Sequence, residues 1–296
     1  MQVDIWGNRT AREAQYHVFH DESEPQPGGR WLLIGLLFVR SDHVEAIRQQ
    51  LCECRAQHGY DGEVHFSALP ASFGGQWGGK ARVARCWLHS YERSLSQNAY
   101  FSALAVDRHS AAYRSNRFTH EFHAYNRFTA MGVKAGISWH LADQERDTLS
   151  IRFISDDKDR ASRPNRGIID NFEDYIPYRA QLDAFLALSS GRRYPTVELA
   201  LELRASAAED LLQLTDVLLG ATQAALTGQA RRETKRVLGQ IVVRWCDDLR
   251  TPPWQQTLGL HRKFSLWAFP DDKGAPYSNV PLALPASDLQ GRLEGF

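Results

Sequence analysis

The sequence predicts an α/β fold in which one mixed sheet is flanked by helices. Two strand-like runs, 16–21 and 31–39, are separated by a turn-rich loop and indicate a long-looped hairpin at the start of the chain. Strand-like and helical patterns then alternate along the rest of the chain, as they do in such folds. The 296 residues, 43% of them hydrophobic, can bury a full core without disulfides or a structural metal. We therefore expect one elaborated domain over residues 1–296, with its core at about 16–268 and a C-terminal extension at 269–296.

The individual elements follow from the spacing of apolar residues. Residues 31–39 are apolar on both faces, which is typical of a central strand, whereas 148–155 and 197–204 alternate as half-buried strands do. The same reasoning predicts shorter extended runs at 63–66, 99–107 and 263–269. It predicts helices at 42–58, 81–96, around 118–125, 209–226 and 231–249. A further helical stretch follows Asp157, runs to about residue 189 and is interrupted near Pro177.

Composition excludes several classes of protein. The 35 basic and 35 acidic side chains balance, so any surface that binds nucleic acid must be local. The longest apolar run is far shorter than the roughly 20 residues of a membrane helix, and the start of the chain lacks the pattern of a secretion signal. The cysteines are too few and scattered for a disulfide framework, so we expect reduced thiols at Cys52, Cys54, Cys86 and Cys246. These features predict a cytoplasmic protein without a membrane span, and they leave its oligomeric state open.

Asp216 is the most informative acidic residue. It lies in a predicted helix, 211–220, that has almost no polar face, and Leu212 and Leu219 share its side of that helix. An ionised carboxylate in an apolar setting costs several kcal/mol unless a cation or hydrogen bonds compensate. A metal ion would provide that compensation. A buried ion pair with an arginine, or a cap on a neighbouring loop, is the alternative.

Other acids lie at the ends of extended runs. Asp21 follows a strand, where functional acids often occur, although a solvated turn is an alternative. Glu63 and His65 are two apart in an extended piece and therefore point the same way. Asp156 and Asp157 follow the 148–155 run on opposite faces, and the pattern does not decide between them. Hard cations such as Mg²⁺ take oxygen ligands, and nucleases with two metal ions hold the reacting phosphodiester oxygens between such carboxylates.

Three segments resemble a known family. His20-Asp-Glu-Ser23, Glu63-Val-His-Phe66 and Leu212-Gln-Leu-Thr-Asp-Val-Leu-Leu-Gly220 resemble the domain of unknown function 3800 (DUF3800), a prokaryotic and phage family regarded as ribonuclease-H-like, metal-dependent nucleases. The resemblance spans about residues 16–268. It implies a ribonuclease-H-like fold with Ser206 at the family's serine position. It also implies metal ligands at Asp21, Glu63, Asp156 and Asp216, with His65 as a further ligand or a proton shuttle.

The sequence departs from the family pattern at three places. Glu24 replaces the family's glycine, and Thr215 replaces its usual alanine. Many members also carry an aspartate in the strand before the serine, where this chain has Leu203 and Arg204.

The resulting hypothesis is a phosphodiesterase that uses two Mg²⁺ or Mn²⁺ ions and acts on RNA or DNA. Basic residues that could follow a phosphate backbone come directly after Asp156, at Lys158, Arg160, Arg163 and Arg166. A second basic cluster opens the helix predicted at 231–249, and consists of Arg231, Arg232, Lys235 and Arg236. An ordinary solvated face is the alternative for both clusters. The alternative for the whole protein is a catalytically degenerate module of the same fold that binds nucleic acid or a protein partner.

Overall fold

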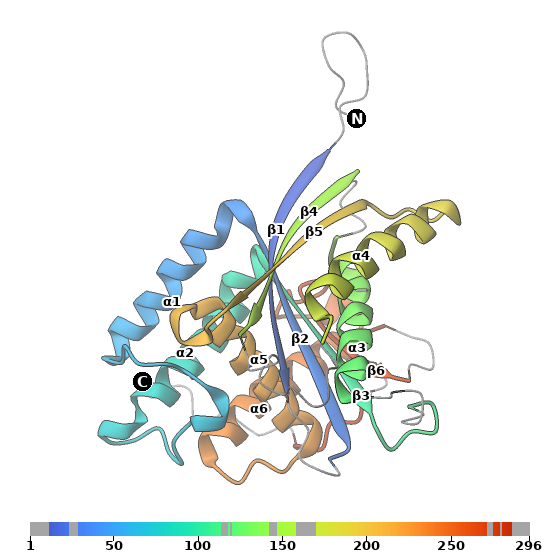
Figure 1. Ribbon diagram of the computed structural model, residues 1–296. Helices are drawn as coiled ribbons and strands as arrows, with labels where there is room; N and C mark the ends of the chain where they lie inside the picture. Colours follow the sequence, from blue (N-terminus) through green and yellow to red (C-terminus); the bar gives the residue numbers. More distant parts are fainter. Residues whose placement is uncertain are drawn as a thin grey trace.

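A six-stranded sheet forms the centre of the described structure, in the order β5-β4-β1-β2-β3-β6 (Figure 1). A computed structural model of the chain describes residues 12–23, 29–113, 118, 120–141, 147–157, 170–270, 275–278 and 280–285. The strands are β1 (Glu13–Ser23), β2 (Trp31–Arg40), β3 (Ala99–Asp107), β4 (Thr148–Asp156), β5 (Thr196–Arg204) and β6 (Phe264–Phe269). The β1–β2 and β2–β3 pairs are antiparallel, and the other three pairs are parallel. The predicted mixed sheet and opening hairpin are confirmed.

Helices cover both faces of this sheet and create two cores (Figure 1). One face carries α1 (Val44–His58), α2 (Gly79–Arg93), α5 (Asp210–Thr227) and α6 (Glu233–Arg250). The other carries α3 (Glu121–Gly136), which continues as a π-helical turn over Ile137–Leu141, and α4 (Phe172–Ser189). Because β2 lies between these layers, all but the last of its residues are buried. The predicted α/β fold class is confirmed, while the division into a single domain with a C-terminal extension stays a prediction.

Helix α5 lies directly on the strands that carry the site. A Cβ atom added to Gly35 of β2 would come within 3.2–3.3 Å of the Leu219 side chain of α5. Because glycine has no side chain, Gly35 lets α5 approach the sheet closely. Gly35 is the register partner of Asp21 in β1. The close contact of α5 with β1 and β2 therefore brings a late helix next to an early strand.

Two local predictions are corrected by the structure. Residues 63–65 join no strand in the described sheet, and they lead into a short 3₁₀ turn at Phe66–Ala68. Pro177 does not interrupt its helix, because it lies inside α4. The burial of Ile176, Ala180 and Ala184 against the sheet outweighs a local penalty of about 3 kcal/mol for an internal proline.

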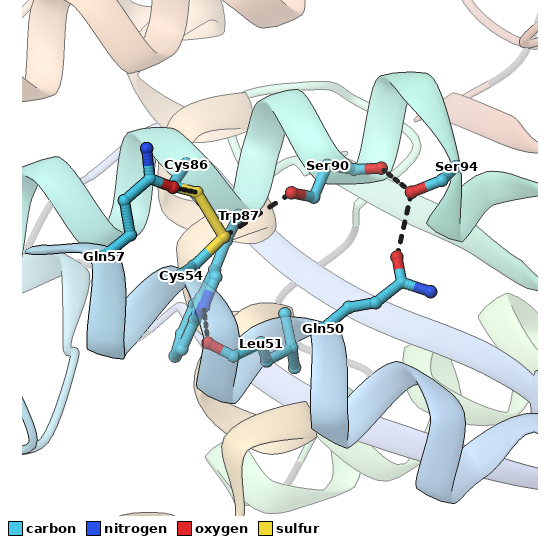
Figure 2. The surroundings of a disulfide bond; sticks show 8 residues. All are labelled: Gln50, Leu51, Cys54, Gln57, Cys86, Trp87, Ser90 and Ser94. Carbon is cyan, nitrogen blue, oxygen red and sulfur yellow. Dashed lines mark hydrogen bonds between the residues drawn. A yellow bond between two sulfur atoms is a disulfide. The ribbon is translucent and has the colours of Figure 1, made fainter.

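Two of the four cysteines form a disulfide, so the prediction of four reduced thiols is wrong. Cys54 of α1 and Cys86 of α2 are bonded across a Cα–Cα distance of 5.9 Å (Figure 2). The packing of α1 against α2 brings together two thiols that are 32 residues apart, which sequence spacing alone did not indicate. Cys52 and Cys246 are free, the first exposed and the second buried. Cysteine usage therefore no longer supports a reducing, cytoplasmic compartment.

None of the helices in the described ranges combines the length and hydrophobicity that a bilayer span requires.

Candidate metal and catalytic site

Asp21 lies near the end of β1 on the face that α5 covers. The two-residue period of the strand sends Val18 and His20 toward α3 and α4, and Phe19 toward α5. Asp21 follows Phe19 in this alternation, and it is 7% exposed. A strand thus directs an acidic side chain into the layer between the sheet and α5.

Asp156 ends β4, which runs parallel to β1 with Ser155 beside His20. Ile154 packs in the core on the α5 side, so the same alternation places Asp156 on the face that Asp21 uses. Asp157, the alternative that the sequence left open, is exposed. The Ser206 N–H donates to Asp156 Oδ1 at 3.0 Å and holds the carboxylate at the end of the strand.

Asp216 reaches out of α5 toward the 63–68 segment. Its Oδ2 accepts a hydrogen bond from the Phe66 N–H at 2.6 Å and lies 3.4 Å from His65 Nδ1. The predicted alternation of the segment holds, because Val64 and Phe66 are buried while Glu63 is exposed and His65 is half-buried.

His65 is held by its neighbour Ser67. The Ser67 N–H donates to His65 Nδ1 at 3.2 Å, and the Ser67 hydroxyl oxygen lies 3.1 Å from the same nitrogen. Because Nδ1 accepts a hydrogen bond, the neutral imidazole carries its proton on Nε2. In this form His65 can donate a hydrogen bond from a defined atom, Nε2.

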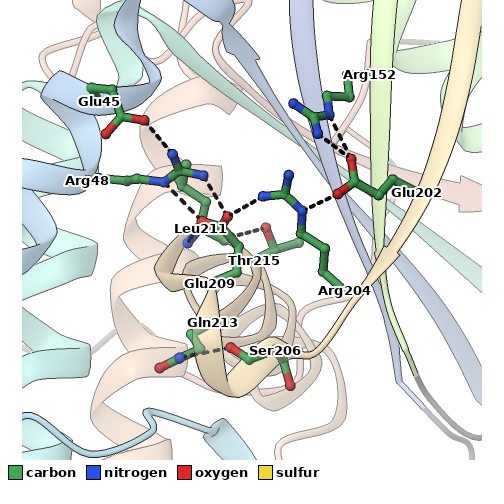
Figure 3. A network of polar contacts seen from close by, with 10 residues as sticks. All are labelled: Glu45, Arg48, Arg152, Glu202, Arg204, Ser206, Glu209, Leu211, Gln213 and Thr215. Atoms are coloured by element: carbon green, nitrogen blue, oxygen red, sulfur yellow. Dashed lines mark hydrogen bonds and ion pairs between the residues drawn. The ribbon is translucent and has the colours of Figure 1, made fainter.

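Gln213 connects the separate parts of the site, and sequence analysis assigned it no role. Its Oε1 accepts from the Val64 N–H at 2.7 Å and from Arg55 Nη2 at 2.8 Å. Its Nε2 donates to the Ser206 carbonyl at 2.9 Å (Figure 3). The signal that could have found it is position, because a buried glutamine three residues before Asp216 lies on the same side of an apolar helix.

All the site residues proposed for catalysis or metal binding line one small cavity of about 10 Å³. Its lining consists of Asp21, Glu63, Val64, His65, Asp156, Ser206, Leu212, Gln213 and Asp216. Those lining residues include four carboxylates and no lysine or arginine. Folding therefore brings together acids that are nearly 200 residues apart in the chain, as the metal-site prediction requires.

Arg204, which departs from the family pattern, is engaged by acids outside this cavity. Its Nε lies 2.6 Å from Glu202, and its Nη1 lies 3.1 Å from Glu209, a carboxylate that Arg48 also contacts at 2.6 Å (Figure 3). The hydrogen bond from Arg204 lowers the pKa of Glu202. The Arg204 guanidinium is thus turned toward Glu202 and the buried Glu209, neither of which lines the cavity.

The donor set of the cavity suits a hard divalent cation, but it is not a preformed coordination shell. Carboxylates are the ligands that Mg²⁺ and Mn²⁺ prefer, and like charges gathered in one place favour a cation among them. Within the described residues, however, no group of three or more His, Cys, Asp or Glu side chains is arranged to hold a metal ion. The residue types fit the metal, whereas their present spacing would have to tighten around it.

Only the second of the two predicted basic clusters lies within the described residues. Lys158, Arg160, Arg163 and Arg166 lie outside the described residues. The second cluster opens α6 beside the site, where Lys235 Nζ donates to the Ser67 carbonyl at 3.1 Å. Desolvation, and secondarily Arg232, lowers the pKa of Lys235, while Asp216 opposes both effects.

Two archaeal ribonucleases are among the solved structures that this chain resembles. Ribonuclease H2 from Pyrococcus horikoshii is 11% identical, and the match covers 80% of this chain and 90% of that one with a TM-score of 0.35. Ribonuclease HII from Archaeoglobus fulgidus, solved with PCNA, is 12% identical, and the match covers 80% and 91% with a TM-score of 0.31. No model of a known protein family and no curated protein matches the chain. Scores this low carry no argument about fold or activity, and membership of DUF3800 stays a prediction.

Proposed function

We propose that this protein is a divalent-metal-dependent nuclease with a ribonuclease-H-like fold. The observation that supports it best is the convergence of Asp21, Glu63, Asp156 and Asp216 on one cavity whose described lining contains no lysine or arginine. These four acids come from two adjacent parallel strands, one loop and one helix. A structural ion pair needs only one acid and one base, so an assembly of four acids is better explained by a bound cation.

The four carboxylates would hold Mg²⁺ or Mn²⁺, with two ions expected. When bound, such ions neutralise charge on a phosphodiester and lower the pKa of water. The chain's own residues orient this assembly, because the Phe66 N–H positions Asp216 and the Ser206 N–H positions Asp156. His65, whose Nδ1 accepts from the Ser67 N–H, would donate a hydrogen bond from Nε2 to an oxygen of the phosphodiester.

The test is hydrolysis of labelled single-stranded, duplex and RNA–DNA hybrid substrates with and without Mn²⁺. Loss of an outer partner of a metal ligand already costs about 10–100-fold in activity, so Asp21→Asn and Asp216→Asn should each lower cleavage by at least about 100-fold. Asp157→Asn is the matched control, since Asp157 is exposed beside the site and should leave cleavage unchanged. Cleavage that survives both Asp21→Asn and Asp216→Asn contradicts the assignment, and the substrate panel separates RNA from DNA.

A second candidate function is a catalytically degenerate module that binds nucleic acid or a protein partner. The absence of a preformed three-ligand group among the described residues favours it. Calorimetric titration with Mn²⁺ separates the two candidates. A working site gives saturable heat that Asp216→Asn removes, while a degenerate site gives none.

A further inference from the structure

A second, much larger hollow lies next to the carboxylate cavity. It has a volume of about 1330 Å³, and we name it the Arg231 groove. Its lining comes from the start of β2, the C-terminal half of α5, the turn between α5 and α6, and the first turn of α6. The lining residues with charged or hydrogen-bonding side chains are Arg30, Trp31, His109, Gln223, Thr227, Gln229, Arg231 and Lys235.

Phe66 joins the groove to the cavity. It lines the groove, and its N–H donates to Asp216 Oδ2, which lines the cavity. Lys235 Nζ lies 5.2 Å from the centre of the Phe66 ring and donates to the carbonyl of the next residue, Ser67. The groove and the carboxylate cavity are therefore neighbours that meet at Phe66.

The groove carries positive charge, although the net charge of the whole protein is zero. Arg30, Arg231 and Lys235 line it, and no aspartate or glutamate is among its described lining residues. Arg30 is partly neutralised by Asp107 at 2.8 Å, whereas Arg231 is exposed at the turn before α6. Glutamine and threonine side chains lie between these cations. This mixture of cations and neutral hydrogen-bonding groups is what contacts phosphates and sugars at nucleic-acid interfaces.

We propose that the Arg231 groove binds the sugar–phosphate backbone of the nucleic-acid strand whose phosphodiester is presented to the carboxylate cavity. This inference rests on the proposed nuclease function, and it adds where the strand runs and which residues hold it. Electrostatic contacts of this kind are independent of base sequence and weaken as salt rises.

Binding is tested without hydrolysis, by fluorescence anisotropy of a labelled single-stranded oligonucleotide in EDTA over a series of KCl concentrations. Each phosphate contact with a single strand contributes about 0.7 to the slope of log K against log salt, so Arg231→Gln should reduce the slope by about 0.7. The double variant R231Q/K235Q should reduce it by about 1.4. Arg93→Gln is the matched control, because Arg93 is exposed at the end of α2 and does not line the groove.

Because Lys235 also bonds the Ser67 carbonyl, Arg231→Gln alone is the variant expected to keep the native thermal unfolding midpoint. An unchanged slope in R231Q/K235Q overturns the proposal, and so does an equal loss in Arg93→Gln. Competition by polyglutamate as strong as that by unlabelled oligonucleotide also overturns it and indicates an acidic protein partner.

The outcome is separable from that of the nuclease assay. Slopes that fall as expected in a protein that cleaves nothing support the groove and contradict the nuclease. Cleavage that needs Asp21 and Asp216, together with an unchanged R231Q/K235Q slope, supports the nuclease and contradicts binding in the groove.

Discussion

At the scale of single residues, the site depends on a buried polar side chain, Gln213, that forms several hydrogen bonds at once. Gln213 is 2% exposed, and its one side chain accepts from the Val64 N–H and from Arg55 and donates to the Ser206 carbonyl. It therefore ties together the loop that carries Glu63 and His65, and the turn whose N–H holds Asp156. Removing one member of such a network leaves its partners buried without hydrogen bonds.

The first stability prediction concerns this glutamine. Gln213→Leu keeps the volume but leaves the Val64 N–H unpaired, so the free energy of unfolding should fall by about 1–3 kcal/mol. Urea denaturation measures the change, with Gln49→Leu on the exposed side of α1 as the control. A Gln213→Leu protein as stable as the wild type would show that Gln213 does not hold the loop.

At the scale of elements, α1 and α2 form a cross-linked pair that supports the site from outside. The Cys54–Cys86 disulfide joins the two helices, and Trp87 Nε1 donates to the Leu51 carbonyl at 3.0 Å beside it (Figure 2). From α1, Arg55 donates to the Gly62 carbonyl and pairs with Asp210 of α5, both at 2.6 Å. The helix pair thus reaches the 62–65 loop through a single, mostly buried arginine.

The disulfide should contribute measurably to stability. Cys86→Ser frees a loop of about 30 residues in the unfolded chain, which should lower the free energy of unfolding by about 2–4 kcal/mol. Urea denaturation measures the change, and Cys52→Ser, at an exposed free thiol, should leave it unaltered. Four titratable thiols in the unfolded, unreduced wild type would contradict the presence of the bond.

At the scale of the whole molecule, the parallel strands set the position of the site. The carboxyl ends of β1 and β4 meet at one edge of the sheet, which is where ligands bind in open α/β sheets. The opposite layer is a second core beneath α3 and α4, and it holds His140 against Tyr100 and the Arg262 carbonyl. Burial lowers the pKa of His140 to about 4, although its hydrogen bond with the Arg262 carbonyl opposes this shift.

His140 should make global stability depend on pH. Its pKa in the folded protein lies below the unfolded value of 6.5, so between about pH 4 and 6.5 the unfolded chain binds a proton that the native state does not. The stabilisation is fully present above pH 6.5 and is lost as pH falls toward 4, by about 2 kcal/mol at pH 5.

The measurement is urea unfolding of the wild type and of His140→Asn between pH 7.5 and 5. The variant lacks the titrating group, so its stability should fall less steeply over this interval. Parallel curves for the two proteins would contradict the prediction.

Much of the fold and part of the site could be predicted because they depend on local periodicity. The alternation of 148–155 and the apolar 31–39 run each specify a strand and its buried face. The apolar face around Asp216 likewise indicated an acid facing the protein interior, and the resemblance to DUF3800 connected these acids. The helix pattern also located α5, although it did not reveal the role of Gln213.

Only the tertiary structure decided which distant residues meet. It placed Asp156 rather than Asp157 in the cavity lining, brought the 63–66 loop onto α5, paired Cys54 with Cys86, and turned Arg204 toward Glu202 and Glu209. Hydrophobic periodicity and composition indicate which face of each segment is buried. Contacts between segments 30 to 200 residues apart depend instead on how closely the helices pack on the sheet. The close approach of α5 at Gly35 makes one site of acids that the sequence could only place one by one.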